Sequence, residues 1–158
     1  MTVEPLAPIP AGVDAEKWRA ACEQIRSYCG WHIAPSITET VRVDGSGGDT
    51  QLLPTLHLTD LTGVKSDGRA VLDPEWSEMG MIRGSWTSKF RGVEATMTHG
   101  FESCPVEILP IVIAVMSGES GIVKAVTSGP HSVTYADAAI VDGGKTSAQV
   151  ATLNRYRL

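Results

Sequence analysis

The segment Gly45-Ser46-Gly47-Gly48-Asp49-Thr50 is the part of the sequence that most invites a phosphate-binding interpretation. A phosphate loop needs a strand before it, a helix after it and a lysine that reaches the phosphates. No lysine follows these glycines, and the next segment has the composition of a strand. The turn preferences of Gly, Asp and Ser therefore predict the tip of a β-hairpin.

Two cysteines and a histidine could be imagined as metal ligands. Cys22 and Cys29 are seven residues apart, whereas the ligands of structural zinc come in pairs separated by two to four residues. Only Cys29 and His32 have such a spacing, and no second pair follows. Apolar packing of the thiols is the better interpretation, and we expect no metal and no cofactor. With Cys104 the count is odd, which favours reduced, intracellular thiols.

A hydrolase site would need a nucleophile beside a histidine. None of the four histidines (His32, His57, His99 and His131) adjoins a Gly-x-Ser-x-Gly nucleophile elbow. His99 and Glu102 lie near the end of a predicted strand, where a paired surface histidine is common. A hydrolase is therefore the weakest of the functional interpretations, and we expect a protein without catalytic activity.

Size and charge restrict the class of protein. A chain of 158 residues is long enough to bury a core without disulfides or metal. Its formal net charge of −5 argues against a general affinity for nucleic acid through basic patches. The longest apolar run, 108–116, is too short to cross a bilayer, and the N-terminus lacks the basic region of a signal peptide.

The first elements are predicted with the clearest local signals. Residues 1–13 contain several prolines and read as an extended N-terminal arm. Asp14 can cap a helix that Gly30 ends. Between them the apolar residues follow helical spacing, which predicts an amphipathic helix over 15–29. These apolar residues are Trp18, Ala21, Cys22, Ile25, Tyr28 and Cys29.

Residues 36–102 form a predicted β insertion. Short segments rich in β-branched residues alternate with turn signals, as in a small antiparallel sheet or sandwich. The predicted strands after the glycine-rich turn are Leu52–Leu58, Leu61–Lys65, Met81–Arg83, Thr87–Phe90 and Val93–Thr98.

A second helix is expected over Val106–Met116. Ser103 can cap it, and Pro105 suits its first turn. The segment is apolar on all sides, which predicts burial on all faces, with a bend at Pro110. We therefore expect alanine substitution of either Ile111 or Ile113 to destabilise the fold.

The remaining residues, 119–158, read as a β segment and a terminal helix. Val123–Thr127 and Ser132–Tyr135 are predicted strands, and Thr146 or Ser147 begins a helix that runs through Leu153. The predicted fold class is α+β. A small helical core (14–35 and 103–118) carries the inserted β region, and 14–158 form a single domain with extended termini.

The candidate interface residues are aromatic or basic. Tyr, Trp and Arg are enriched at binding hot spots. Trp18 and Trp31 accompany the first helix and are assigned to the core, whereas core and interface are equally good interpretations for Trp76 and Trp86. The chain ends Arg155-Tyr156-Arg157-Leu158, where Tyr156 would be an anchor and the arginines would pair with acidic groups. We expect that deletion of 154–158 leaves the fold nearly intact.

The order of these elements, with Tyr28-Cys29-Gly30-Trp31-His32 before a proline and a terminal Arg-Tyr-Arg, resembles the head-to-tail connector (adaptor) proteins of siphophages, especially those of actinobacterial hosts. The resemblance implies a structural virion protein that forms a twelve-fold ring beneath the portal, in the neck at the head–tail junction. Its implied partners are the portal protein, neighbouring copies of itself, and a stopper or tail-terminator protein. Double-stranded DNA would pass through the ring without sequence-specific binding, and no membrane is involved.

This resemblance implies assembly in the bacterial host cytoplasm. Since the sequence contains no self-sufficient oligomer seam such as a heptad repeat, we expect a monomer that forms rings only on the portal. The alternative from another class is a small β-rich module that binds a ligand or peptide, which a deep polar pocket containing His57 or His99 would favour.

Overall fold

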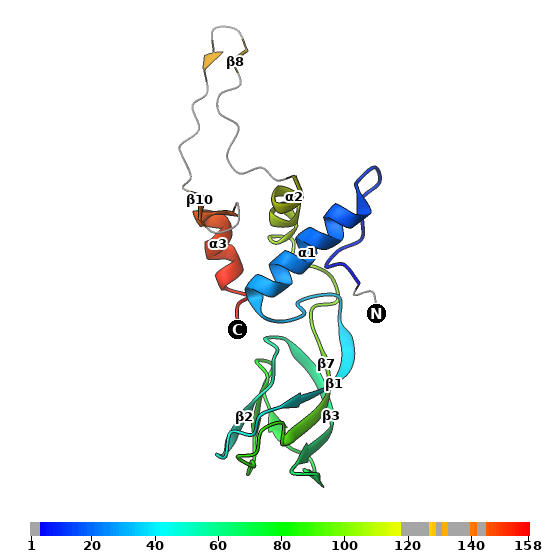
Figure 1. Ribbon diagram of the computed structural model, residues 1–158, viewed down its shortest axis with the longest axis vertical. Helices are drawn as coiled ribbons and strands as arrows, with labels where there is room; N and C mark the ends of the chain where they lie inside the picture. Colours follow the sequence, from blue (N-terminus) through cyan, green and yellow to red (C-terminus); the bar gives the residue numbers. More distant parts are fainter. Residues whose placement is uncertain (1–3, 118–126, 129–130, 133–139, 142–144) are drawn as a thin grey trace. The chain divides into compact units, whose positions relative to one another are not determined.

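The computed structural model describes residues 4–117, 127–128, 131–132, 140–141 and 145–158. The described residues contain three helices and antiparallel strands, so the predicted α+β class is confirmed. They divide into two compact units (Figure 1). The helical unit comprises Pro8–Cys29 and Pro105–Arg157, and the β-unit comprises Gly30–Cys104 with the N-terminal residues up to Ala7 and with Leu158.

Helix α1 (Ala15–Cys29) has the bounds that the sequence predicted. The carboxylate of Asp14 accepts hydrogen bonds from the backbone N–H groups of Glu16 (2.9 Å) and Lys17 (3.2 Å), as expected of an N-cap. Gly30 follows the helix with a φ of 84°, a conformation that costs glycine little. The helix is therefore delimited by the two local signals from which it was predicted.

The core of the helical unit forms where α1 contacts α2 (Leu109–Ser117) and α3 (Ser147–Asn154). The cysteines of α1 are buried in this core without forming disulfides, and Cys104 of the β-unit is likewise buried and not disulfide-bonded, so the predicted apolar packing is confirmed. The buried residues of the three helices include Trp18, Ala21, Cys22, Ile25, Cys29, Ile111, Val112 and Leu153.

Helix α2 differs from its prediction in two ways. It begins at Leu109 after a turn, so Pro110 occupies the first helical turn, where a missing N–H is harmless, and does not interrupt the helix. Burial on all faces is also wrong: Ile111 is 3% exposed, but Ile113 is 50% exposed. Successive residues of a helix point about 100° apart, and the neighbouring elements cover only part of the circumference.

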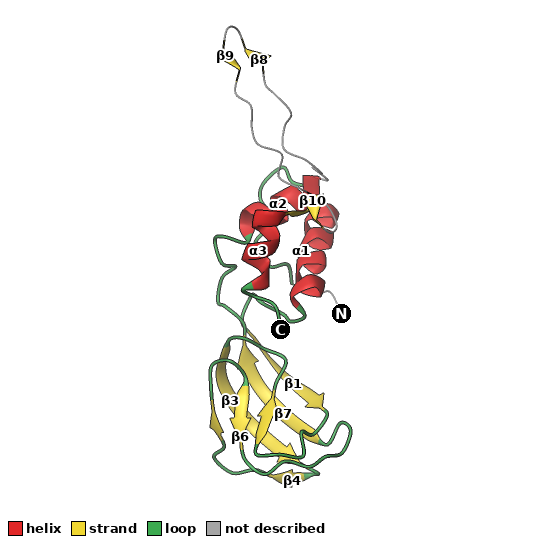
Figure 2. Ribbon diagram, turned by 90° about the vertical axis from the view of Figure 1, so that its left-hand side faces the viewer, coloured by secondary structure: helices red, strands yellow, loops and turns green. Residues whose placement is uncertain are grey.

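The β-unit consists of two antiparallel sheets (Figure 2). The larger has the order β1 (Ile37–Val43), β7 (Val93–His99), β3 (Leu58–Ser66) and β4 (Arg69–Ala70). The smaller has the order β2 (Thr50–Leu52), β6 (Met81–Arg83) and β5 (Glu75–Trp76). The two antiparallel sheets share one core, so the predicted antiparallel β insertion is confirmed. The buried residues of this core are Leu53, Leu58, Val64, Ile82, Trp86, Val93, Ala95 and Met97.

Two predicted strands are wrong. Leu52 ends β2 and Leu58 begins β3, and the connection between them contains Pro54, which cannot donate a ladder hydrogen bond. Thr87–Phe90 is a loop. The predicted strands Leu61–Lys65 and Val93–Thr98 lie within β3 and β7, and Met81–Arg83 coincides with β6.

The glycine-rich segment is a connection between sheets. β1 pairs with β7 and β2 pairs with β6, so the segment does not form the predicted hairpin tip. The carbonyls of Lys89 and Thr87 accept hydrogen bonds from the backbone N–H groups of Gly45 (2.9 Å) and Gly47 (3.0 Å). A Cβ on Gly45 would lie 1.9 Å from the Thr87 oxygen, so this close approach requires glycine.

The C-terminal region contains two short strand pairs. β8 (Thr127–Ser128) pairs with β9 (His131–Ser132), and β10 (Ile140–Val141) pairs with β11 (Lys145–Thr146). The rest of the predicted strands Val123–Thr127 and Ser132–Tyr135 lies outside the described residues. Helix α3 begins at Ser147 and confirms the predicted terminal helix.

Candidate interaction surfaces

The C-terminal residues are held on the helical unit by side-chain contacts. The Tyr156 hydroxyl donates a hydrogen bond to the Glu107 carboxylate, and Arg155 lies 3.6 Å from the same carboxylate. The Arg157 guanidinium lies 5.4 Å from the centre of the Tyr28 ring, a cation–π geometry. Tyr28 in turn donates a 2.9 Å hydrogen bond to the Asn154 side chain. The tail therefore belongs to the packing of this unit.

These contacts argue against the expectation that deletion of 154–158 leaves the fold nearly intact. The deletion removes partners of Glu107 and Tyr28, and we now expect it to lower the melting temperature. The side chains of Arg155 and Leu158 are 66% and 51% exposed, so they could also contact another molecule.

The sequence did not decide between core and interface for Trp76 and Trp86, and the structure places these two residues in different environments. Trp86 is 5% exposed and belongs to the shared core of the two sheets, so core packing is the correct interpretation for it. Trp76 is 38% exposed at the edge of the smaller sheet, where it pairs with Ile82 of β6. Trp18 and Trp31 are buried, as predicted. Of the four tryptophans, only Trp76 offers surface to a partner.

The outer face of the larger sheet carries polar cross-strand pairs. Thr38 and Thr98 hydroxyls lie 2.7 Å apart, and those of Thr40 and Thr96 lie 2.8 Å apart. The next pair is ionic, since Glu94 binds both Arg42 (2.6 Å) and Lys65 (2.8 Å). The pKa of Glu94 lies below its ordinary value because Lys65 and Arg42 donate hydrogen bonds to its carboxylate, and the bond from Lys65 has the larger effect. Such pairs stabilise the register of the three strands.

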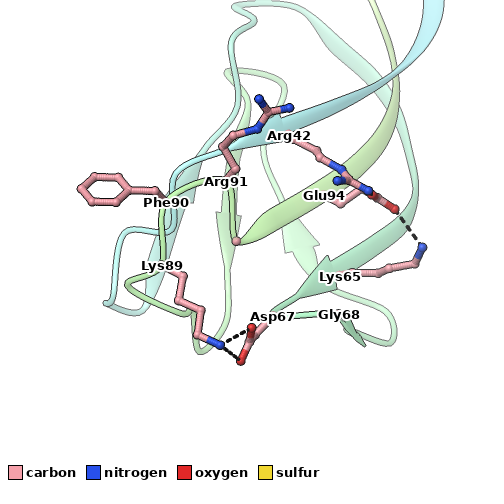
Figure 3. A pocket seen from close by; sticks show the side chains of 9 residues that line it. Arg42, Lys65, Asp67, Gly68, Lys89, Phe90, Arg91 and Glu94 are labelled. Carbon is pink, nitrogen blue, oxygen red and sulfur yellow. Dashed lines mark hydrogen bonds and ion pairs between the residues drawn. The ribbon is translucent and has the colours of Figure 1, made fainter.

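A shallow concavity of about 420 Å³ continues this face toward the 87–92 loop (Figure 3). Lys89 reaches across its edge to Asp67, at 2.6 Å. Phe90 points away from the sheet and is 88% exposed. The lining residues are Arg42, Lys65, Asp67, Gly68, Lys89, Phe90, Arg91, Gly92 and Glu94, so cations outnumber anions there.

Sequence reasoning missed the exposed apolar side chains of the β-unit. Phe90 and Leu72 are 88% and 87% exposed, and Leu52 and Met81 are opposite one another on the outer side of the smaller sheet. The signal available for Phe90 was its position between two cations, Lys89 and Arg91, with Gly92 following Arg91. That pattern is more typical of an exposed loop than of the strand that was predicted.

The histidines have carboxylate partners in the β-unit. His57 lies 2.7 Å from Glu78 and stacks on Phe101 with 4.2 Å between ring centres. His99 is buried and its Nε2 lies 3.0 Å from Glu39, so the predicted surface pairing with Glu102 is wrong. Neither His57 nor His99 lines one of the three concavities described for the β-unit, so these concavities do not favour a ligand-binding module or a hydrolase.

We predict that His99 makes the stability of the protein pH-dependent. Burial lowers the pKa of His99 from its ordinary value of 6.5, although the Glu39 carboxylate opposes this effect. The folded state then binds a proton less readily than the unfolded state. The contribution of His99 is therefore complete above about pH 6.5 and declines as the pH falls below that value.

Urea denaturation at about pH 7.5 and about pH 5.5 measures this effect. Wild-type protein should lose more stability between the two pH values than the His99→Gln variant, which cannot titrate at this position. Equal losses in wild type and His99→Gln would show that His99 has no such role.

Among the residues that the structure describes, no three His, Cys, Asp or Glu side chains are grouped as metal ligands. Within the same residues, no helix combines the length and apolar character needed to cross a membrane.

Comparison with known proteins gives structural neighbours only. No family model and no curated protein matches the sequence. A chain from the neck of a native gene transfer agent (GTA) particle, computed with C12 symmetry, matches with a TM-score of 0.58 and 18% identity, over 91% of this chain and 82% of that chain. A chain from the neck of an empty GTA particle, computed with C6 symmetry, matches with a TM-score of 0.54 and 16% identity, over 97% and 83%.

The shared fold therefore extends over nearly all of this chain and over more than four-fifths of each neighbour. Both neighbours come from phage-like GTA particles and not from siphophages of actinobacterial hosts. The comparison thus shows a fold shared with chains from particle necks and does not extend to that narrower class.

Proposed function

We propose that the chain is a structural subunit of the neck of a phage-like particle, where identical copies form a ring beneath the portal. The observation that carries the proposal is the fold shared with GTA neck chains over more than four-fifths of each chain. The C12 symmetry of one neighbour's particle neck favours a dodecamer. No catalytic step is part of this function.

In this role the ring extends the DNA channel and offers a platform to the next protein of the neck, a stopper or a tail terminator. Double-stranded DNA passes through the ring without being read in sequence. A net charge of −5 supports this, because an acidic protein does not retain the DNA backbone. The protein would be assembled in the bacterial host cytoplasm and remain in the neck of the virion.

The C-terminal residues are the proposed contact with the portal. Arg155 and Leu158 are exposed; Arg155 also lies 3.6 Å from Glu107, and Tyr156 and Arg157 contact Glu107 and Tyr28. We expect the double variant Arg155→Ala/Leu158→Ala to melt within about a degree of wild type, as exposed substitutions usually do. It should bind the portal at least about tenfold more weakly, since each hot-spot contact contributes more than about 1 kcal/mol.

A pull-down on the portal protein, paired with a melting curve, measures both properties. Exposed Arg19 of α1 supplies the control variant Arg19→Ala, which should bind normally. Wild-type binding by the double variant would contradict docking through the C-terminus and leave the ring itself untouched.

The isolated protein should be a monomer. Its described helices are at most 15 residues long and none presents a heptad seam, so ring contacts depend on alignment by a template. Light scattering at micromolar concentration tests this expectation. A stable dodecamer in the absence of portal protein would contradict template-dependent assembly.

A further inference from the structure

The loop between β6 and β7 presents an aromatic side chain to solvent. Phe90 is 88% exposed and projects away from the larger sheet (Figure 3). The loop beneath it is well anchored, because Gly92 N–H bonds to the Lys89 carbonyl (3.1 Å) and Arg91 N–H bonds to the Asp44 carboxylate (2.7 Å). A large apolar side chain on a fixed loop is the kind of residue that anchors protein interfaces.

The same β-unit has a second concavity elsewhere on its surface, which we call the Leu72 concavity; its lining is partly apolar and partly polar. Its volume is about 360 Å³, ample for a phenyl ring, and its walls include Leu61, Val71, Leu72, Pro74 and Trp76. Leu72 at its edge is 87% exposed, and Trp76 is 38% exposed. This concavity shares no lining residue with the one beside Phe90.

Charge is complementary between the two surfaces. Arg91 follows Phe90, and its guanidinium forms no ion pair in the described part of the chain. Asp73 is the one charged residue among those that line the Leu72 concavity, and its carboxylate is likewise unpaired among the described residues. Two of the nearby charge pairs, Lys89–Asp67 and Arg83–Glu75, are neutralised within the chain.

We propose that Phe90 of one copy inserts against the apolar side chains of the Leu72 concavity of the next copy, with Arg91 facing Asp73 beside it. This inference rests on the proposed ring and names a contact that holds it. A ring requires heterologous contacts, in which one patch meets a different patch on the neighbour. Two complementary patches that share no residue meet this requirement, and the occupant of the concavity is a second copy of this chain.

Charge reversal tests the contact on rings assembled with portal protein. Arg91→Glu and Asp73→Lys should each lower the yield of rings by about tenfold or more, because like charges then face one another. The double variant Arg91→Glu/Asp73→Lys should recover most of the yield. Phe90→Ala should also lose rings, yet it should melt like wild type because its side chain is exposed. Arg19→Glu on the helical unit is the charge-matched control and should assemble normally.

Disulfide trapping gives a second measurement that does not depend on charge, which is useful because Asp73 has a φ of 47° that disfavours lysine. The native cysteines are buried, so a Phe90→Cys/Leu72→Cys variant carries the accessible thiols. Oxidation of its rings should give a ladder of covalent oligomers, whereas either single variant should give none.

The outcomes separate this contact from the ring itself. Suppose that the wild-type protein forms rings, that the charge variants form them equally well, and that oxidation gives no ladder. This result would overturn the contact and leave the proposed function standing. Loss of rings in both single variants without recovery in the double variant, and again no ladder, would also overturn it. Failure of the wild-type protein to form rings on the portal would refute the proposed function on which the contact depends.

Discussion

Replacing Ile111 by alanine will lower the free energy of unfolding by about 2–5 kcal/mol, whereas Ile113→Ala will change it by less than about 0.5 kcal/mol. The two residues have the same side chain and lie two positions apart on α2. Ile111 is 3% exposed in the core of the helical unit, and Ile113 is 50% exposed. Only the first substitution removes buried methylene groups and leaves a cavity.

Chemical denaturation of both variants, followed by far-ultraviolet circular dichroism, measures the difference. The pair controls for helix propensity, because both substitutions exchange the same residue types in one helix. Equal losses would mean that Ile113 is covered as well, and a neutral Ile111→Ala would show that α2 is not part of the core.

Replacing Trp86 by alanine will cost about 3–5 kcal/mol, and Trp76→Ala will cost less than half as much. Trp86 lies in the core that both sheets share, whereas Trp76 has more than a third of its surface in solvent. The indole nitrogen of Trp86 is buried, and no hydrogen-bond partner for it lies among the described residues. Trp86→Phe should therefore be milder than Trp86→Ala, since it keeps an aromatic ring and removes a costly donor.

Urea denaturation curves of the three variants decide this ranking. If Trp76→Ala proved as harmful as Trp86→Ala, the edge of the smaller sheet would be as important to the fold as its core. A stable Trp86→Ala variant would contradict the shared core.

The elements that the sequence predicted well are those with local signals. Asp14 and Gly30 delimit α1 through contacts within a few residues, so its bounds followed from the sequence. Buried and half-buried residues alternate along β7, and this alternation is visible in the order of apolar and polar residues in its sequence.

The wrong predictions concern segments whose structure is determined by contacts with residues far away in the sequence. Thr87–Phe90 has the residues of a strand, but the carbonyls of Thr87 and Lys89 bond to glycines 40 and 44 residues earlier, which makes the segment a loop and exposes Phe90. In α2 the sequence is apolar on every side, so periodicity cannot tell which face the neighbouring helix leaves uncovered. This is why Ile113 was misassigned.

The candidate interface residues show the same limit. Residue type alone identified Arg155, Tyr156 and Arg157 as candidate interface residues. It could not show that Tyr156 donates a hydrogen bond to Glu107, 49 residues earlier in the chain. The concavity around Leu72 and Trp76 combines residues of β3 with the segment that follows β4, and no motif in the sequence brings them together.

Formation of a ring beneath a portal is tested most directly by negative-stain electron microscopy of portal complexes purified with and without the full-length protein. We predict an added layer of density at one end of the portal, with twelve-fold symmetry in end-on class averages, which is the symmetry of one structural neighbour's particle neck. Portal particles that look the same with and without the protein, at concentrations well above micromolar, would contradict it.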